Sequence, residues 1–419
     1  MKLWWPLAGI TLLGLAAWAP PTKPKVAKWS VILGGDMDGY LSPCGCTSPM
    51  TGGLRRRATA TQELSFGDRT VILDNGSLAG GTSTQEQMKA QTAAEALRAM
   101  GATAIHFTSA DAPLGQGLAL SMQALSGNRL VTDSVQGGSV TLKQLVEKGP
   151  FLVSAASTDP TALANFGGQT LSDDQVATDL VVKAQARQRA PILLLHGSHV
   201  DAVRLATAHP KLALIQYRTT GNPPPKAERV GNVLLATAGE HGKSIVRLIW
   251  GPKGFEAYAV VSLGPQFADD PKISRIYDNY LKRVDQANLL AEVPRRETVA
   301  FAGSKACAPC HQTATKVWQS SAHAHALATL ETKHEDRDPE CVPCHVTGLE
   351  STRGFMSKQE TPQFAFVGCE SCHGPALDHS KSPATNPLPK VGESACAPCH
   401  TSLNSPNFDF AKYWKRVQH

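Results

Sequence analysis

The chain has 419 residues, of which 42% are hydrophobic, 18% charged and 6% aromatic. These proportions exclude a disordered chain, and the length predicts about two or three domains with hydrophobic cores of their own. The formal net charge is +6 and the densest basic cluster is only Arg55-Arg56-Arg57, so the sequence does not indicate a nucleic-acid partner.

Residues 1–28 are predicted to be a targeting segment. The positive charge of Lys2 precedes an uncharged, mostly apolar run from Leu3 to Ala19, and Ala17-Trp18-Ala19 has the form of a signal-peptide cleavage site. Pro20 directly after that site disfavours cleavage, and the apolar run is close to the minimum length of a membrane span. We therefore expect either a cleaved signal peptide or a retained N-terminal anchor. Both imply a periplasmic or other extracytoplasmic location.

Residues 29–269 alternate short apolar runs with helical patterns, which favours an α/β layered domain. Helices are expected over Gln85–Met100 and Asp174–Gln188. The predicted strands are Ser30–Leu33, Thr70–Leu73, Ala102–Phe107, Phe151–Ser154, Pro191–Leu195, Leu212–Gln216, Val233–Ala236, Ser244–Ile249 and Tyr258–Ser262.

Residues 270–300 are predicted to form a connecting helix and a linker. Asp270-Pro271 is a helix-start signal and Pro294 ends the pattern. The apolar side chains between them fall on one face of a helix, which we expect to pack on the α/β domain. They are Ile273, Ile276, Tyr277, Tyr280, Leu281 and Val284.

Residues 301–419 are poor in aliphatic side chains and rich in Cys and His. Eight of the ten cysteines fall in four copies of Cys-x-x-Cys-His, the pattern of c-type haem attachment. We predict four haem c groups, whose porphyrins would supply the core that this segment lacks. The attachment residues are Cys307, Cys310 and His311; Cys341, Cys344 and His345; Cys369, Cys372 and His373; and Cys396, Cys399 and His400.

The chemistry of the motif explains its composition. The two thiols add to the haem vinyl groups, and the adjacent histidine reaches the iron from the proximal side. Zinc sites and disulfides are the structural alternatives. Zinc is closed by four nitrogen or sulfur ligands and does not need a histidine directly after the second cysteine, so the repetition favours haem.

The sixth iron ligands have to come from five other histidines of this segment. We favour His323, His379 and His419 as distal ligands, with His419 at the end of an expected terminal helix over Phe408–Gln418. His325 lies two residues from His323 and would face away from it on a helix, and His334 lies in a charged, solvated loop. The haem of His345 therefore has the least certain partner and is the candidate for an open iron.

The order of these motifs resembles the cytochrome c-554 family of tetrahaem cytochromes. The resemblance covers about residues 303–419 and is most specific in Val367-Gly368-Cys369-Glu370-Ser371-Cys372-His373-Gly374-Pro375. It implies a mainly helical domain around closely stacked haems and activity in electron transfer. It also matches His323, His379 and His419 to distal-ligand positions, and one haem in that family can be five-coordinate.

Residues 29–295 resemble the metallophosphoesterase domain of the 5′-nucleotidase type. A subset of that family with Pro-Cys-Gly-Cys…Gly-Gly-Leu-x-Arg-Arg matches better, here over Pro43–Cys46 and Gly52–Arg56, and in that subset a haem domain can follow. The other resembling segments are Gly35–Gly39, Val71–Gly76, Gly101–Ile105, Ile192–His196 and Ala238–Lys243.

The metal-binding pattern of that family is incomplete here. Its D-x-H motif becomes Asp36-Met37-Asp38, and its bridging Asp falls at Ser77. Its G-N-H-E/D motif falls near His106–Ser109, and its G-H-x-H motif falls near Gln216–Arg218. His196 stands at a ligand position of the family, but one His and two Asp do not make a two-metal site. We predict an inactive domain in which Asp36 and Asp38 are turn residues at a strand end. Cys44 and Cys46 have no role in either pattern. The open alternatives are a strained disulfide, a metal site, a cap on a haem edge, and a redox role beside the haems.

The sequence as a whole predicts an exported electron-transfer protein. The alternatives are a haem oxidoreductase acting on a small nitrogen or sulfur compound at an open haem, a surviving metal-dependent 5′-nucleotidase, and stacked subunits that form a longer haem conductor. The expected partners are redox proteins, and the membrane as well if the N-terminal segment is retained.

Overall fold

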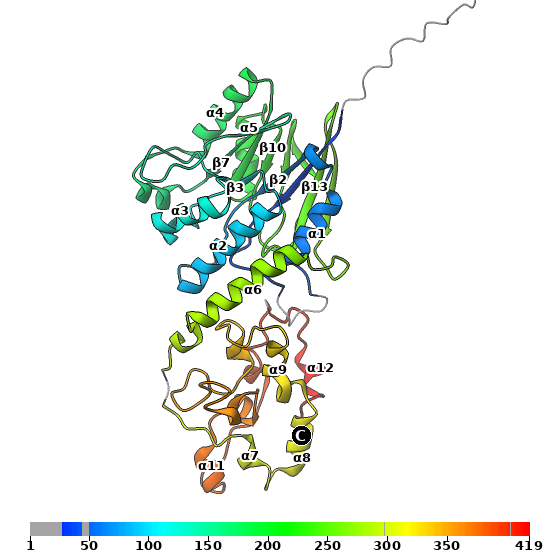
Figure 1. Cartoon of the computed structure of the whole chain (residues 1–419). Coiled ribbons are helices and arrows are strands. Elements are labelled where there is room, and N and C mark those ends of the chain that lie inside the picture. The colour runs from blue at the N-terminus through cyan, green and yellow to red at the C-terminus, as the bar shows by residue number, and fades with distance from the viewer. Residues whose placement is uncertain (1–26, 44–49, 297, 403) are drawn as a thin grey trace, which may run out of the picture.

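The computed structural model describes residues 27–43, 50–296, 298–402 and 404–419. Most of the predicted targeting segment, and Cys44 and Cys46, lie outside the described residues. In Figure 1 the α/β part and the C-terminal part follow one another along the long axis of the molecule, with helix α6 (Pro271–Gln286) between them. Within the described residues, no helix is long and apolar enough to cross a membrane.

The α/β part is built on two six-stranded sheets. The first has the order β14-β13-β1-β2-β3-β4, in which β1 to β4 run parallel and β13 and β14 are antiparallel additions. Its strands are β1 (Trp29–Gly34), β2 (Thr70–Asp74), β3 (Ala104–His106), β4 (Leu130–Val131), β13 (Ser244–Gly251) and β14 (Gly254–Ser262).

The second sheet has the order β11-β12-β10-β9-β7-β6, with a parallel centre and an antiparallel strand at each edge. Its strands are β6 (Val146–Lys148), β7 (Phe151–Ser157), β9 (Ala190–His196), β10 (Leu214–Gln216), β11 (Glu228–Val230) and β12 (Val233–Ala236). A small separate sheet pairs β5 (Val135–Gln136) with β8 (Gln169–Thr170).

The two sheets pack face to face because alternate residues of each strand point to opposite sides. Val31 and Leu33 of β1 join Val153 and Ile192 of the second sheet in a shared apolar layer. Ile32, between them in sequence, points the other way, into a core with the helices. The result is a four-layered arrangement of helices, sheet, sheet and helices.

Helices cover both outer faces (Figure 1). The first sheet is covered by α1 (Leu54–Leu64), α2 (Thr84–Ala99), α3 (Gln116–Leu125) and α6, and the second by α4 (Asp173–Ala186) and α5 (His199–Ala208). Local signals set several helix starts: Ser83 caps α2, Ser172 forms a capping box with Gln175, and Asp270 accepts from the backbone N–H groups of Lys272 and Ile273.

All nine predicted strands and both predicted helices of the α/β part are present, and the predicted α/β class is confirmed. The sequence reasoning missed short edge strands such as β6 and β11 and the helices α1, α3 and α5. Edge strands of two or three residues carry too few alternating side chains to give a periodic signal.

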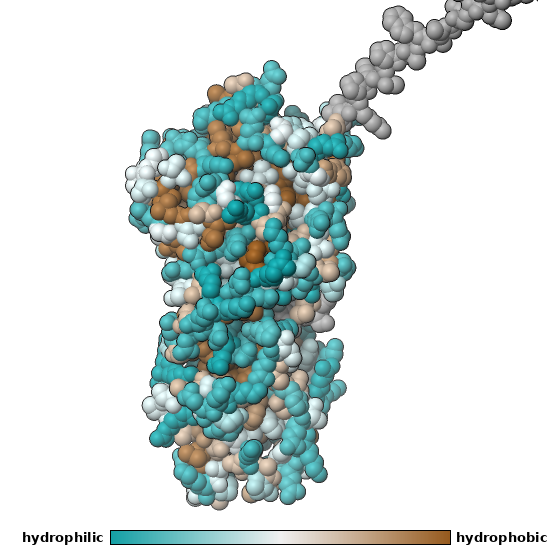
Figure 2. Space-filling model, viewed as in Figure 1, coloured by the Kyte–Doolittle hydropathy of each residue, from teal (hydrophilic) through white to brown (hydrophobic). Residues whose placement is uncertain are grey.

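The C-terminal part consists of short helices and turns. The α-helices are α7 (Ser304–Cys307), α8 (Gln312–Gln319), α9 (Ala326–Glu331), α10 (Cys369–His373), α11 (Leu377–Lys381) and α12 (Phe410–Trp414). The expected terminal helix over 408–418 is thus shorter than predicted. Figure 2 shows a mainly hydrophilic surface on the viewed face of the whole molecule, with scattered apolar spots.

This part has a small apolar core of its own, which corrects the expectation that porphyrins alone would supply one. Leu330, Val342, Val346, Phe355 and Phe364 are buried in a common cluster. Val342 lies inside the second Cys-x-x-Cys-His motif, so the polypeptide around that motif is packed by side chains.

Candidate haem sites and the altered phosphoesterase site

In the first and last Cys-x-x-Cys-His motifs, one tight turn places the histidine next to its first cysteine. The backbone N–H of His311 donates to the carbonyl of Cys307 at 2.9 Å, and His400 donates to Cys396 in the same way at 2.9 Å. In the second motif the turn is the short 3-10 helix η6 (Val342–Cys344), and His345 donates to Val342 at 2.9 Å. Each turn presents its thiols and its imidazole together, as covalent attachment of haem requires.

Three of the four motif histidines each face a histidine from outside the motifs. The ring centroids are 6.2 Å apart for His311 and His379, and 6.3 Å apart for His400 and His323. They are 5.9 Å apart for His373 and His419. The three facing partners are those favoured from the sequence.

These separations fit one iron between each pair of rings. A metal–imidazole bond is about 2 Å long, so two nitrogens on opposite sides of one metal are about 4 Å apart and the ring centroids about 6 Å apart. Burial lowers the pKa of His323, His373 and His400, which favours the neutral imidazole that binds iron. The donor set therefore suits haem with two axial histidines at three of the motifs.

The fourth motif histidine, His345, is different. Its Nδ1 lies 2.7 Å from the carbonyl of Ala326, which would leave Nε2 available to bind iron. Among the described residues, no imidazole faces His345 at a comparable distance. His325 instead contacts the carbonyl of Gln319 through Nε2 at 3.2 Å, and His334 is exposed in a turn with a left-handed backbone.

The first and third motifs are held together by contacts that the sequence reasoning did not identify. Before haem is attached, the Cys307 thiol hydrogen-bonds to Cys369 and lowers the pKa of the Cys369 thiol. Glu370 is buried, and its carboxylate accepts hydrogen bonds from the backbone N–H groups of Ala302, Gly303 and Ala376, each at 2.8 Å. A buried acidic residue between two haem cysteines is the signal that could have indicated this role.

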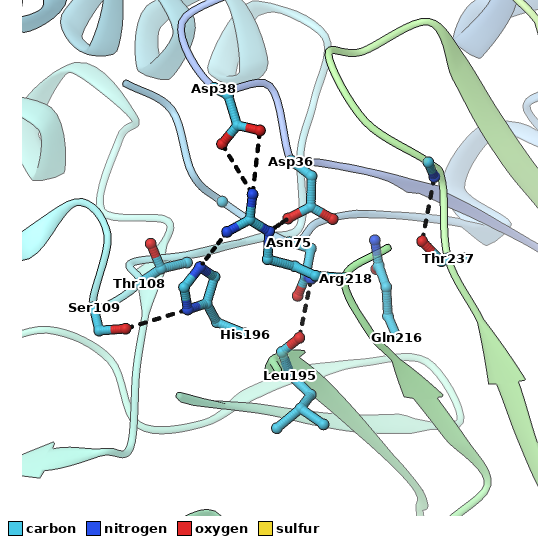
Figure 3. A network of polar contacts seen from close by, with 12 residues as sticks. Asp36, Asp38, Asn75, Thr108, Ser109, Leu195, His196, Gln216, Arg218 and Thr237 are labelled. Carbon is cyan, nitrogen blue, oxygen red and sulfur yellow. Dashed lines mark hydrogen bonds and ion pairs between the residues drawn. The ribbon is translucent and has the colours of Figure 1, made fainter. Parts of the chain in front are cut away.

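The second candidate site lies where parallel strands of both sheets end, a usual position for ligand sites in α/β folds. Asp36 and Asp38 follow β1, His196 ends β9, and Arg218 follows β10. The Arg218 guanidinium lies among the other three side chains, as Figure 3 shows. Its Nε is 3.0 Å from Asp36 Oδ1, its Nη2 is 3.2 Å from both oxygens of Asp38, and its Nη1 is 3.0 Å from His196 Nε2.

Burial controls the protonation of this group. It raises the pKa of Asp36 well above its ordinary value, although the Arg218 charge acts to lower it. It lowers the pKa of His196 to about 4, so His196 is neutral at pH 7. Because the guanidinium only donates, Nε2 of His196 accepts and Nδ1 carries the proton. The Ser109 hydroxyl, 3.2 Å from Nδ1, therefore accepts a hydrogen bond and is not activated as a nucleophile.

The other positions of the phosphoesterase pattern also hold no metal ligands. Ser77 is fully buried with a positive φ of 52°, Thr108 donates to Asp111 at 2.7 Å, and Gln216 donates to the carbonyl of Gly34 at 2.7 Å. Among the described residues, no group of three or more His, Cys, Asp or Glu side chains is arranged to hold a metal ion. A two-metal centre does not fit this site, because the cation among the carboxylates is Arg218.

Asp36 and Asp38 do lie in a turn after a strand, with positive φ values of 50° and 45°. Their pairing with Arg218 was not foreseen. The signal for it was present in the sequence, because Arg218 stands where the family's pattern places the last histidine of G-H-x-H.

Comparison with known proteins agrees with both parts of the structure. Residues 306–374 match the family described as cytochrome c554 and c-prime. Cytochrome c-554 of Nitrosomonas europaea is 30% identical over 146 residues, a match that covers 27% of this chain and 62% of that protein. The chain thus spans less than two thirds of this relative. Its C-terminal part is similar to a c-type cytochrome.

The α/β part has the fold of 5′-nucleotidases. The 5′-nucleotidase precursor of Thermus thermophilus superposes with a TM-score of 0.53 and 14% identity, covering 73% of this chain and 68% of that chain. Sulfate thiohydrolase SoxB of the same organism gives 0.50 and 14%, covering 63% and 62%. At such identities the likeness concerns the fold alone. The predicted combination of a cytochrome c-554-like part with a 5′-nucleotidase-like part is confirmed.

Proposed function

We propose that this protein is an exported c-type cytochrome that carries four covalently bound haems and exchanges electrons with protein redox partners. The observation that carries the proposal is the set of three facing histidine pairs, each of which joins one motif histidine to one outside the motifs. Chance would not bring three such pairs to the spacing of an iron between two imidazoles.

When bound, haem c supplies a reversible one-electron couple whose potential depends on axial ligands, burial and nearby hydrogen bonds. The chain's own residues would hold the haems by eight cysteines and fix their orientation by the proximal histidines. His323, His379 and His419 would be the distal ligands. Because each distal ligand comes from a different segment, haem binding would also tie these short segments together.

The test is a haem count with the spin state of each iron. Denaturing mass analysis of protein matured in a competent host should show the mass of four haems, and the double variant Cys396→Ala/Cys399→Ala should show three. The oxidised protein should contain three low-spin irons and one high-spin iron. A wild-type mass of three haems or fewer would contradict the proposed count.

We also propose that the α/β part, over about residues 29–269, has no phosphoesterase activity. The Arg218 guanidinium pairs with both Asp36 and Asp38 and takes the space that a metal cation would need. The connecting segment 270–300 and the cytochrome part 301–419 complete the proposed domain division, and residues 1–28 would direct export.

A second function is favoured by the absence of an imidazole facing His345 among the described residues. An iron with an open position would allow a small nitrogen or sulfur compound to bind, which would make the protein a haem oxidoreductase. Carbon monoxide binding to the reduced protein tests this. Binding of one equivalent of carbon monoxide per chain supports an open iron, and the absence of binding excludes one.

A further inference from the structure

The α/β part contacts the cytochrome part directly before the second haem motif, through helices α2 and α6. Gln85 of α2 donates through Nε2 to Oδ1 of Asp338 at 2.7 Å and to the Tyr280 hydroxyl of α6 at 2.9 Å. All three side chains are buried, with exposed fractions of 7%, 5% and 2% for Gln85, Asp338 and Tyr280. Asp338 is therefore a buried carboxylate held by an amide from the other part of the chain.

Asp338 is tied to the second haem motif by its backbone as well. Its carbonyl accepts from the N–H groups of Cys341 and Val342, both at 3.0 Å, so the turn that carries the carboxylate continues into the attachment site. These two backbone hydrogen bonds place Asp338 directly beside the haem-attachment residue Cys341.

The hydrogen-bond donors to the Asp338 side chain are uncharged groups. Its side-chain oxygen accepts from Gln85 and from the backbone N–H of Glu340 at 2.9 Å. No ion pair to Asp338 is found within the part of the chain that the structure describes. Charge interactions are stronger in a buried, low-dielectric environment than in water. A negative charge beside a haem favours the oxidised state, which carries one more positive charge, and so lowers the potential.

We propose that the Asp338 carboxylate sets the redox potential of the haem attached at Cys341 and Cys344, and that Gln85 is a positioning residue for it. The α/β part, although inactive as an enzyme, would then form part of the environment of one haem. This inference rests on the proposed cytochrome function.

The test measures the midpoint potential of each haem in the full-length protein by optical titration, with the high-spin haem followed separately. Asp338→Asn keeps the two hydrogen bonds to the side-chain oxygen but removes the charge, so the potential of the high-spin haem should rise while the other three stay unchanged. Asp336→Asn is the matched control. Asp336 lies in the same turn but is partly exposed and only 4.0 Å from Arg337, so it should leave all four potentials unchanged.

The positioning role has its own variants. Gln85→Met removes the donor that fixes the carboxylate. Because the charge is then no longer held in one place beside the second motif, the same potential should rise, by less than in Asp338→Asn. Gln85→Met added to Asp338→Asn should give no further shift, because both act through one charge. Gln87→Met is the control on the same helix, since the Gln87 side chain donates to the nearby carbonyl of Thr82.

The haem count by mass distinguishes a failure of this inference from a failure of the proposed function. If Asp338→Asn carries four haems and its potentials match the wild type, or if all four potentials shift together, the inference is wrong and the cytochrome function stands. If Asp338→Asn fails to mature, the potentials of the Gln85→Met variant test the proposal instead. It leaves the sequence of the cytochrome part intact, and an unchanged potential of the high-spin haem would then overturn the proposal. A wild type without a haem at the second motif would instead refute the proposed function.

Discussion

The Nε atom of Arg218 lies 3.0 Å from Oδ1 of Asp36, and both side chains occupy positions where metallophosphoesterases are expected to bind metal. Asp36 is almost completely buried, and Asn75 beside it follows the end of β2 (Figure 3). An internal cation therefore compensates a carboxylate that would otherwise be buried alone.

Arg218→Ala should destabilise the protein. The substitution leaves Asp36 buried without its cation, which typically costs roughly 3–5 kcal/mol. Because Arg218 is partly exposed, we expect a loss of stability at the lower end of this range. Urea unfolding of the full chain measures it. Arg187→Ala, which breaks a surface pair with Glu147 at 3.6 Å, is the control and should cost less than about 1 kcal/mol. Equal losses for the two variants would show that the Arg218 contacts contribute little.

The wild-type protein should not hydrolyse nucleoside monophosphates, even with added Mg²⁺, Mn²⁺ or Zn²⁺. The reason is that Ser77, Thr108, Gln216 and Arg218 stand where the family pattern requires metal ligands. Phosphate release with purified protein is the measurement, and Asp36→Ala is the matched variant. Metal-dependent turnover that is present in the wild type and lost in Asp36→Ala would contradict an inactive site.

A chain that ends at Gln418 should contain one more high-spin haem than the full protein. The ring of His419 faces that of His373 at 5.9 Å, and loss of the distal imidazole leaves an iron with one axial histidine. Electron resonance and carbon monoxide stoichiometry measure the change, with one additional equivalent expected. His325→Ala and His334→Ala should leave both unchanged. An unaltered spin-state ratio in the shortened chain would exclude His419 as a ligand.

Glu370→Gln should lower the stability of the cytochrome part by about 2–3 kcal/mol. The carboxylate accepts three backbone hydrogen bonds from Ala302, Gly303 and Ala376, and an amide offers an N–H group where an acceptor is needed. Thermal unfolding followed by circular dichroism of the haem band measures the loss. Glu393→Gln, at an exposed position of the same part, should stay close to the wild type.

The haem-attachment pattern and the central strands could be predicted from the sequence because both are local. Cys-x-x-Cys-His needs only neighbouring residues, and a run such as Thr70–Asp74 is apolar enough to indicate a buried strand. The wrong expectation of a long terminal helix has a physical cause. A helix of that length needs an apolar face to pack, and no buried residue is present in Phe410–Trp414.

The fourfold Cys-x-x-Cys-His pattern, the runs of the central strands and the replaced residues of the phosphoesterase pattern can all be read from the sequence. Three features come from the folded chain alone: which imidazoles face one another, the position of Arg218 between Asp36 and His196, and the hydrogen bond from Gln85 to Asp338. These contacts join residues far apart in the chain, 180 positions in the case of Arg218 and Asp38, and 253 for Gln85 and Asp338. No local sequence pattern predicts such long-range contacts, because they depend on how strand ends and helix faces are brought together when the layers pack.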